Sequence, residues 1–134
     1  MSELGFEVQL NRPYDQALEK VTTALKVEGF GVLPHIDVKA TLKEKLGADF
    51  RPYAILDACN PPLAHRALSA NPLAGLMLPC NVTVEENAGG ALVRIANPDL
   101  LITVGPLADD PALRQVVDDA GARLRRVAVT LAEG

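Results

Sequence analysis

Aromatic residues and long apolar runs are both scarce in this chain of 134 residues. Aromatic residues make up only 4% of it and tryptophan is missing, so a hydrophobic core has to be built from aliphatic side chains. No apolar run approaches the ~20 residues of a membrane span, and the first ten residues lack the basic start and apolar stretch of a signal peptide. These features predict a cytoplasmic protein with no membrane partner.

Cysteines and basic residues are also few. The two cysteines, Cys59 and Cys80, cannot form a disulfide scaffold, and in a reducing compartment free thiols are expected. Lysine and arginine total 13 against 17 aspartates and glutamates, which leaves a net charge of −4. Because nucleic-acid binding requires a basic face, a nucleic-acid partner is disfavoured.

The composition that remains is that of an ordinary folded domain, with 49% hydrophobic and 22% charged residues. A chain of this length buries roughly two-thirds of its unfolded surface and needs no metal or disulfide to fold. The chain contains no internal repeat, linker or low-complexity segment. We therefore expect a single domain over residues 1–134.

Hydrophobic periodicity predicts alternating strands and helices. Five strands are expected, over residues 4–10, 30–36, 53–58, 76–86 and 91–96. Helices are expected from Pro13 to just before Gly29, over 38–46, over 61–70, and from Pro111 through an apolar stripe that ends at Leu131. This order favours an α+β, two-layer sandwich with helices packed on one face of a mostly antiparallel sheet of about five strands. The other face is then solvated or used for dimerisation.

Four segments resemble the domain-of-unknown-function family 302. They are Gly29–Leu33, Ile36–Gly47, Tyr53–Ala64 and Gly75–Val82. The family-like core runs from about 29 to 99, flanked by an N-terminal strand and helix and by the C-terminal amphipathic helix. The resemblance implies a two-layer α+β fold that forms homodimers in bacteria and archaea, and it implies no agreed activity.

Two short motifs place a cysteine and an asparagine beside proline, Cys59-Asn60-Pro61-Pro62 and Pro79-Cys80-Asn81. If their strands are neighbours, the two thiols could approach each other. Cys59 would also precede a helix N-terminus, whose unpaired N–H groups stabilise a thiolate or bind an anion. Two thiolates could instead hold a soft metal, with His35, His65 or a second subunit completing the site. The simpler interpretation is that both cysteines are buried as small hydrophobes, since Cys80 shares a strand face with Val82 and Val84.

The neighbouring polar side chains also have two interpretations. Asn60 and Asn81 beside the thiols would form a polar pocket for a small ligand, which Tyr53 could close. Alternatively, Asn60 caps a helix, Asn81 satisfies loop backbone groups and Tyr53 packs in the core or an interface. Asp37 and Asp57 are explained as a helix cap and a strand-end residue.

No Ser/His/Asp arrangement or phosphate-binding loop is present. The sequence therefore predicts a homodimeric module that binds a small molecule or another protein without catalysis, and no cofactor is expected. The alternative is a thiol-based redox or metal-binding protein that uses Cys59 and Cys80. The candidate ligand-binding or redox residues are Cys59, Asn60, Cys80, Asn81 and Tyr53.

Overall fold

The computed structural model describes residues 4–32, 35–78, 80–103 and 105–133. Its strands are β1 (Gly5–Leu10), β2 (Gly31–Val32), β3 (Ile36–Asp37), β4 (Tyr53–Cys59), β5 (Cys80–Asn87) and β6 (Gly90–Ala96). Its α-helices are α1 (Tyr14–Val27), α2 (Val38–Leu46), α3 (Pro61–Ala70) and α4 (Pro111–Glu133). Three short 3₁₀ helices complete it: η1 (Pro72–Leu76), η2 (Pro98–Ile102) and η3 (Gly105–Leu107).

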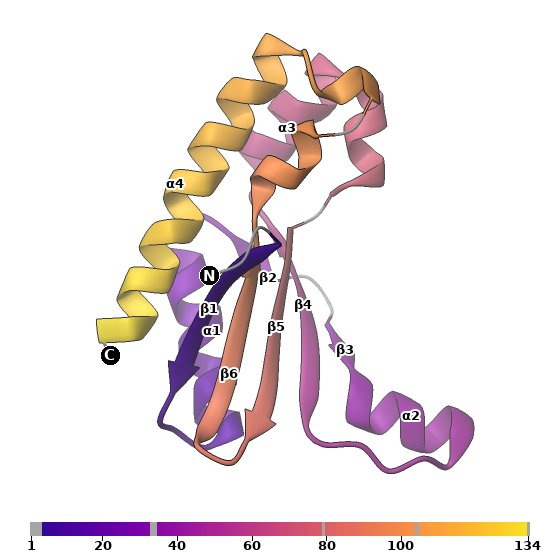
Figure 1. The fold of residues 1–134 in the computed structure, drawn as a ribbon, viewed down its shortest axis with the longest axis vertical. Coiled ribbons are helices and arrows are strands. Elements are labelled where there is room, and N and C mark those ends of the chain that lie inside the picture. The colour runs from indigo at the N-terminus through magenta and orange to yellow at the C-terminus, as the bar shows by residue number, and fades with distance from the viewer. Residues whose placement is uncertain (1–3, 33–34, 79, 104, 134) are drawn as a thin grey trace.

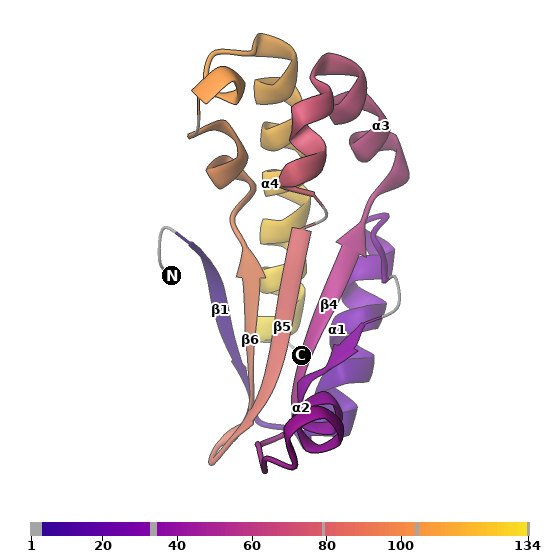
Figure 2. The same cartoon turned by 90° about the vertical axis from the view of Figure 1, so that its right-hand side faces the viewer.

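The strands form one antiparallel sheet in the order β1-β6-β5-β4-β2, and β3 also pairs with β4 (Figure 1). The sheet lies in front of α1 and α4 in Figure 2, so both helices cover the same face. The predicted α+β, two-layer fold is therefore confirmed, with six strands. Within the described residues, no helix combines the length and apolar character that crossing a bilayer requires.

Two of the predicted strands need correction. The strand expected over 30–36 is two short strands, β2 and β3, which pair with opposite ends of β4; residues 33–34 lie outside the described residues, and Pro34 has no N–H to donate to a ladder. The strand expected from residue 76 begins at Cys80. Asn71 instead starts η1, because its side-chain oxygen accepts from the Leu73 N–H at 2.9 Å.

Local capping signals place the helix ends as the sequence predicts. The Asp37 side chain accepts from the Ala40 N–H at 2.9 Å at the start of α2, and Gly47 ends that helix with a φ of 66°. Asp110 accepts from the N–H groups of Ala112 and Leu113 at the start of α4. These caps fix where each helix begins, and hence which of its faces meets the sheet.

The buried side chains form two clusters that α4 joins. The first, here called the sheet cluster, packs the covered sheet face against α1 and the C-terminal half of α4. Its largest fully buried side chains are aliphatic, as predicted, and Phe6 and Phe30 also belong to it. The second, the helical cluster, lies beyond the end of the sheet. It consists of Leu63, Ala67, Ala74, Leu107, Leu113, Val116, Val117 and Ala120.

The face of the sheet opposite α1 and α4, here called the open face, is mixed in character. It carries half-buried Tyr53 and Ile55 on β4, and a buried Glu85 that is ion-paired to Arg51 and Arg94. Helix α2 projects from this side of the sheet (Figure 1), and none of its described side chains is buried.

Candidate functional site

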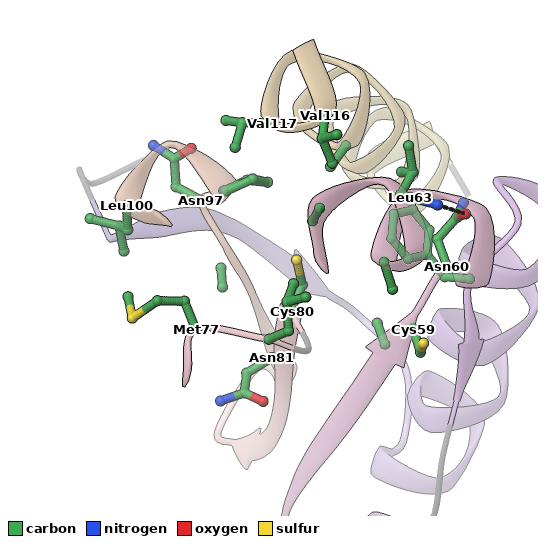
Figure 3. A pocket seen from close by; sticks show the side chains of 18 residues that line it. Cys59, Asn60, Leu63, Met77, Cys80, Asn81, Asn97, Leu100, Val116 and Val117 are labelled. Carbon is green, nitrogen blue, oxygen red and sulfur yellow. Dashed lines mark hydrogen bonds between the residues drawn. The ribbon is translucent and has the colours of Figure 1, made fainter. Parts of the chain in front are cut away.

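A cavity of about 190 Å³ lies between the sheet cluster and the helical cluster. Its wall is built from the adjoining ends of β4, β5 and β6, together with α3, η2 and the N-terminal half of α4. Four of the five candidate residues are in this wall, namely Cys59, Asn60, Cys80 and Asn81 (Figure 3). Tyr53 is not. It lies at the other end of β4, where its ring centroid is 6.2 Å from that of Phe50.

Cys80 is the candidate whose side chain belongs to the covered face of the sheet. It pairs with buried Ala58 across the strands and alternates with buried Val82 along β5, so its side chain shares their face and packs against the sheet cluster. Burial, and secondarily nearby Cys59, raise the pKa of the Cys80 thiol. The thiol is therefore protonated at neutral pH, which is the opposite of an activated nucleophile.

Cys59 lies on the open face, because strand positions alternate and its neighbour Ala58 is buried on the covered face. β4 and β5 are neighbours, as the sequence argument requires, but Figure 3 shows the two side chains pointing in different directions. Both cysteines are free. The fold thus brings the two residues to one end of the sheet without bringing thiol to thiol.

The N-terminus of α3 has no spare N–H group for a thiolate or an anion. Pro61 and Pro62 occupy its first two positions and have no N–H, and the N–H of Leu63 donates to Asn60 Oδ1 at 3.2 Å. The next N–H, of Ala64, already donates to the Asn60 carbonyl at 2.9 Å. The stabilisation of a Cys59 thiolate expected from this helix end therefore lacks its donors.

Asn60 is a buried cap whose hydrogen-bonding groups are both engaged. Besides capping α3, its Nδ2 donates to the Glu28 carbonyl at 3.4 Å, and only 7% of the residue is exposed. Gly29 makes room for this contact, since its φ is +87° and a Cβ there would lie 2.9 Å from Asn60 Nδ2. The capping role proposed for Asn60 is thus present, and the side chain offers little to a ligand.

The Glu28 carbonyl joins three helices, which the sequence did not predict. It also accepts from Arg123 Nη1 of α4 at 3.0 Å, while the Glu28 carboxylate pairs with Arg126 at 2.9 Å. These partners are more than 90 residues apart in the chain, so no local pattern reveals them. The contacts fix the end of α1 and the start of α3 against α4, on one side of the cavity.

Asn81 alternates with Cys80 and pairs with Asp57, so its exposed amide belongs to the open face near the edge of the cavity. His65 and His35 are both exposed. Arg66, next to His65, is also exposed and pairs with Asp119 of α4 at 3.3 Å. Among the described residues, no group of three or more histidine, cysteine or acidic side chains could hold a metal ion.

The cavity wall also contains residues that sequence analysis missed, notably Met77, Asn97, Val116 and Val117. Of the described residues in the wall, none is an aspartate, glutamate, lysine, arginine or histidine. A buried ion without a partner costs several kcal/mol even after the protein relaxes. The arrangement therefore suits an uncharged, largely apolar molecule.

Comparison with known proteins links the chain to a family without an assigned activity. The sequence model of the domain of unknown function DUF302 matches residues 6–131, well beyond the core of about 29–99. The crystal structure of an uncharacterised conserved DUF302 protein from Bacillus stearothermophilus is similar, with 33% sequence identity and a TM-score of 0.84. The similarity covers 97% of this chain and 99% of that chain. A comparison with curated proteins found no match.

Proposed function

This chain belongs to the DUF302 family, and we propose that its cavity binds a small, uncharged and largely apolar molecule. The protein acts as a homodimeric binding module without catalysis of its own. It resides in the cytoplasm, where both of its thiols stay reduced. A small molecule and a second copy of the chain are its partners.

The observation that carries the proposal is a half-open cavity whose described wall has no charged side chain. An apolar cavity of about 150 Å³ is known to bind benzene and to stay dry when empty. The cavity of about 190 Å³ is large enough for a molecule of that size. The protonated Cys80 thiol is a weak hydrogen-bonding group and is compatible with such a ligand.

The exposed surface supports the homodimer. The chain exposes 7576 Å², whereas a compact monomer of 14.2 kDa is expected to expose ~6,800 Å². The excess reflects elements that project from the sheet, such as α2, which has no buried side chain. The open face, with half-buried Tyr53 and Ile55, and the projecting helix α2, with Leu46 73% exposed, are the surfaces that a second copy would cover.

The thiol-based alternative has less support. It needs an activated thiolate, a pair of facing thiols or a third metal ligand from the same chain. Cys80 has a raised pKa, and the two cysteines lie on opposite faces of the sheet. A metal site would need ligands from the second subunit.

The first experiment is native mass spectrometry of the protein purified without chelator or reductant. We expect a dimer with both thiols reduced, and a co-purified molecule where the natural ligand survives purification. A stoichiometric metal, or the mass loss of a disulfide, would favour the thiol alternative instead.

The second experiment blocks the cavity. Ala120 is 7% exposed and lies in the wall, so Ala120→Leu places additional methyl groups in the space a ligand would use. We expect benzene and hexanol to raise the melting temperature of the wild type but not of this variant. Val129→Leu, at a position 54% exposed on the same helix, is the matched control and should respond like the wild type. Equal responses in all three proteins would contradict binding in the cavity.

A further inference from the structure

Four large apolar side chains are exposed within residues 68–77, on α3 and the segment that follows it. The exposed fractions are 43% for Leu68, 47% for Leu73, 83% for Leu76 and 43% for Met77. The other large exposed apolar side chains in the described residues come from separate elements, as in Leu4, Val27, Ile36, Leu46 and Val129. Single exposed apolar residues are normal on a protein surface, whereas contiguous apolar patches are typical of binding surfaces. We call this group the leucine patch.

The leucine patch continues into the cavity. Met77 is both 43% exposed and part of the cavity wall, so it belongs to the surface and to the interior at once. Leu76 directly precedes it, and a Cβ at Gly75 would lie 3.4 Å from Leu68 Cδ2, which places Leu68 against η1. Figure 3 shows Met77 on the opposite side of the cavity from Leu63 and Asn60. Met77 thus gives the half-open cavity an apolar path to the surface.

Two kinds of uncharged ligand would use this path differently. A compact ring would fill the cavity and leave the leucine patch in water. A straight chain would place its end in the cavity and continue across Met77 and Leu76, which removes both surfaces from water. A polar or charged head group would stay outside the cavity, where the uncharged wall imposes no cost on it.

Resting on the proposed function, we infer that the ligand is an unbranched alkyl or acyl chain with its head group in solvent. Its terminal carbons occupy the cavity, and the leucine patch holds the following methylenes. The chain length, and not the identity of the head group, then determines affinity. Each buried methylene should contribute about 0.8 kcal/mol to the free energy of binding, which corresponds to about a fourfold increase in affinity.

The test uses straight-chain 1-alkanols of increasing length, with cyclohexanol as the compact probe, titrated by calorimetry into the full-length protein. We expect affinity to rise about fourfold per methylene. In Leu76→Ser this rise should stop at a shorter chain, while cyclohexanol binds unchanged. Leu76 is 83% exposed, so the variant should fold normally. Leu73→Ser provides a second variant of the patch.

Val129→Ser is the matched control, because Val129 is 54% exposed and lies on the C-terminal half of α4, away from the patch and from the surfaces proposed for the dimer. It should retain the full dependence on chain length. A carboxylate of the same chain length should bind like the alkanol, which distinguishes recognition of the chain from recognition of the head group.

Each of the remaining outcomes overturns a different statement. If alkanols and cyclohexanol bind but chain length has no effect beyond the shortest probes, the inference is wrong and the proposed function stands. If no probe binds, the proposed function fails and the inference with it. If Leu76→Ser instead dissociates the dimer in sedimentation and leaves the chain-length series unchanged, a second copy covers the patch and the inference is wrong.

Discussion

The two ends of α4 lie in two different kinds of hydrophobic cluster. Leu124, Val127 and Leu131 pack against strands whose buried side chains alternate at a fixed spacing, and this sheet cluster is continuous. Leu113, Val116 and Val117 pack against α3 and short 3₁₀ segments, and the cavity lies beside them. A sheet with a fixed register places side chains at regular intervals that a helix can fill, whereas short irregular elements leave gaps. We therefore expect the sheet cluster to carry most of the stability, and the proposed ligand space lies where the helical cluster meets it.

The largest expected effect is the difference in stability between the same Leu→Ala substitution made at the two ends of α4. Leu124 and Leu113 are both fully buried. Leu124→Ala should cost up to ~5 kcal/mol, because the sheet cannot close around the void, whereas Leu113→Ala should cost nearer ~2 kcal/mol, because short elements can relax into the space. Urea unfolding with equal m-values measures the difference. If Leu113→Ala costs as much as Leu124→Ala, the helical cluster is as rigid as the sheet cluster.

The next effect compares an ion pair whose carboxylate is buried with one whose carboxylate is partly exposed. The Glu85 side chain is 9% exposed and that of Asp119 36%, while their arginines, Arg94 and Arg123, are 43% and 35% exposed. Burial acts to raise the pKa of Glu85, but hydrogen bonds from Arg94 and Arg51 outweigh it and hold that pKa below its usual range. Because the folded pKa is lowered, the carboxylate stabilises the fold above about pH 4.5 and this stability is lost as the pH falls through the folded value. Arg94→Ala should cost ~1–3 kcal/mol at pH 7 and flatten the loss of stability in acid.

Asp119 provides the control for that measurement at the helical end. A hydrogen bond from Arg123 lowers its pKa in the same direction, but both side chains are about one-third exposed, at 36% and 35%. Solvent and salt screen such a pair, so Asp119→Asn should change acid unfolding far less than Arg94→Ala. Equal changes would show that burial does not decide the strength of these pairs.

A third prediction decides between the two roles of Asn60. As a cap it stabilises α3, so Asn60→Ala should lower stability by about 1 kcal/mol, and Asn60→Ser, which keeps an acceptor, should recover part of it. Affinity for hexanol should change little in either variant, because both hydrogen-bonding groups of Asn60 are already engaged. A large loss of affinity in the well-folded Asn60→Ser variant would instead assign the amide to the ligand.

The contrast between the clusters also explains what the sequence could predict. Caps such as Asp37 and Asp110 are local, and the alternation of β1 and β5 is visible in the chain itself. The sequence of the strand over 53–58 shows little alternation, because Ile55 on the open face is as apolar as Leu56 on the covered face. That similarity concealed the face of Cys59. The cavity was not predictable, since Val116 and Val117 join Ala58 and Asn60 only through packing between distant segments.

The smallest effect compares the two cysteines, which lie at the boundary between the clusters. Cys59→Ala removes a half-buried thiol from the open face and should change stability by less than ~0.5 kcal/mol. Cys80→Ala should cost ~1 kcal/mol, because losing this side chain from the wall enlarges the cavity.

The two thiols should also differ in reactivity. In the native protein at pH 7, iodoacetamide should modify Cys80 more slowly than Cys59, since burial keeps the Cys80 thiol protonated. Both cysteines line the cavity, but the Cys80 side chain packs with the covered face and that of Cys59 lies on the open face, so hexanol should slow the modification of Cys80 more than that of Cys59. Peptide mapping by mass spectrometry measures both rates in one sample. Protection of Cys59 in place of Cys80 would move the binding space to the open face of the sheet.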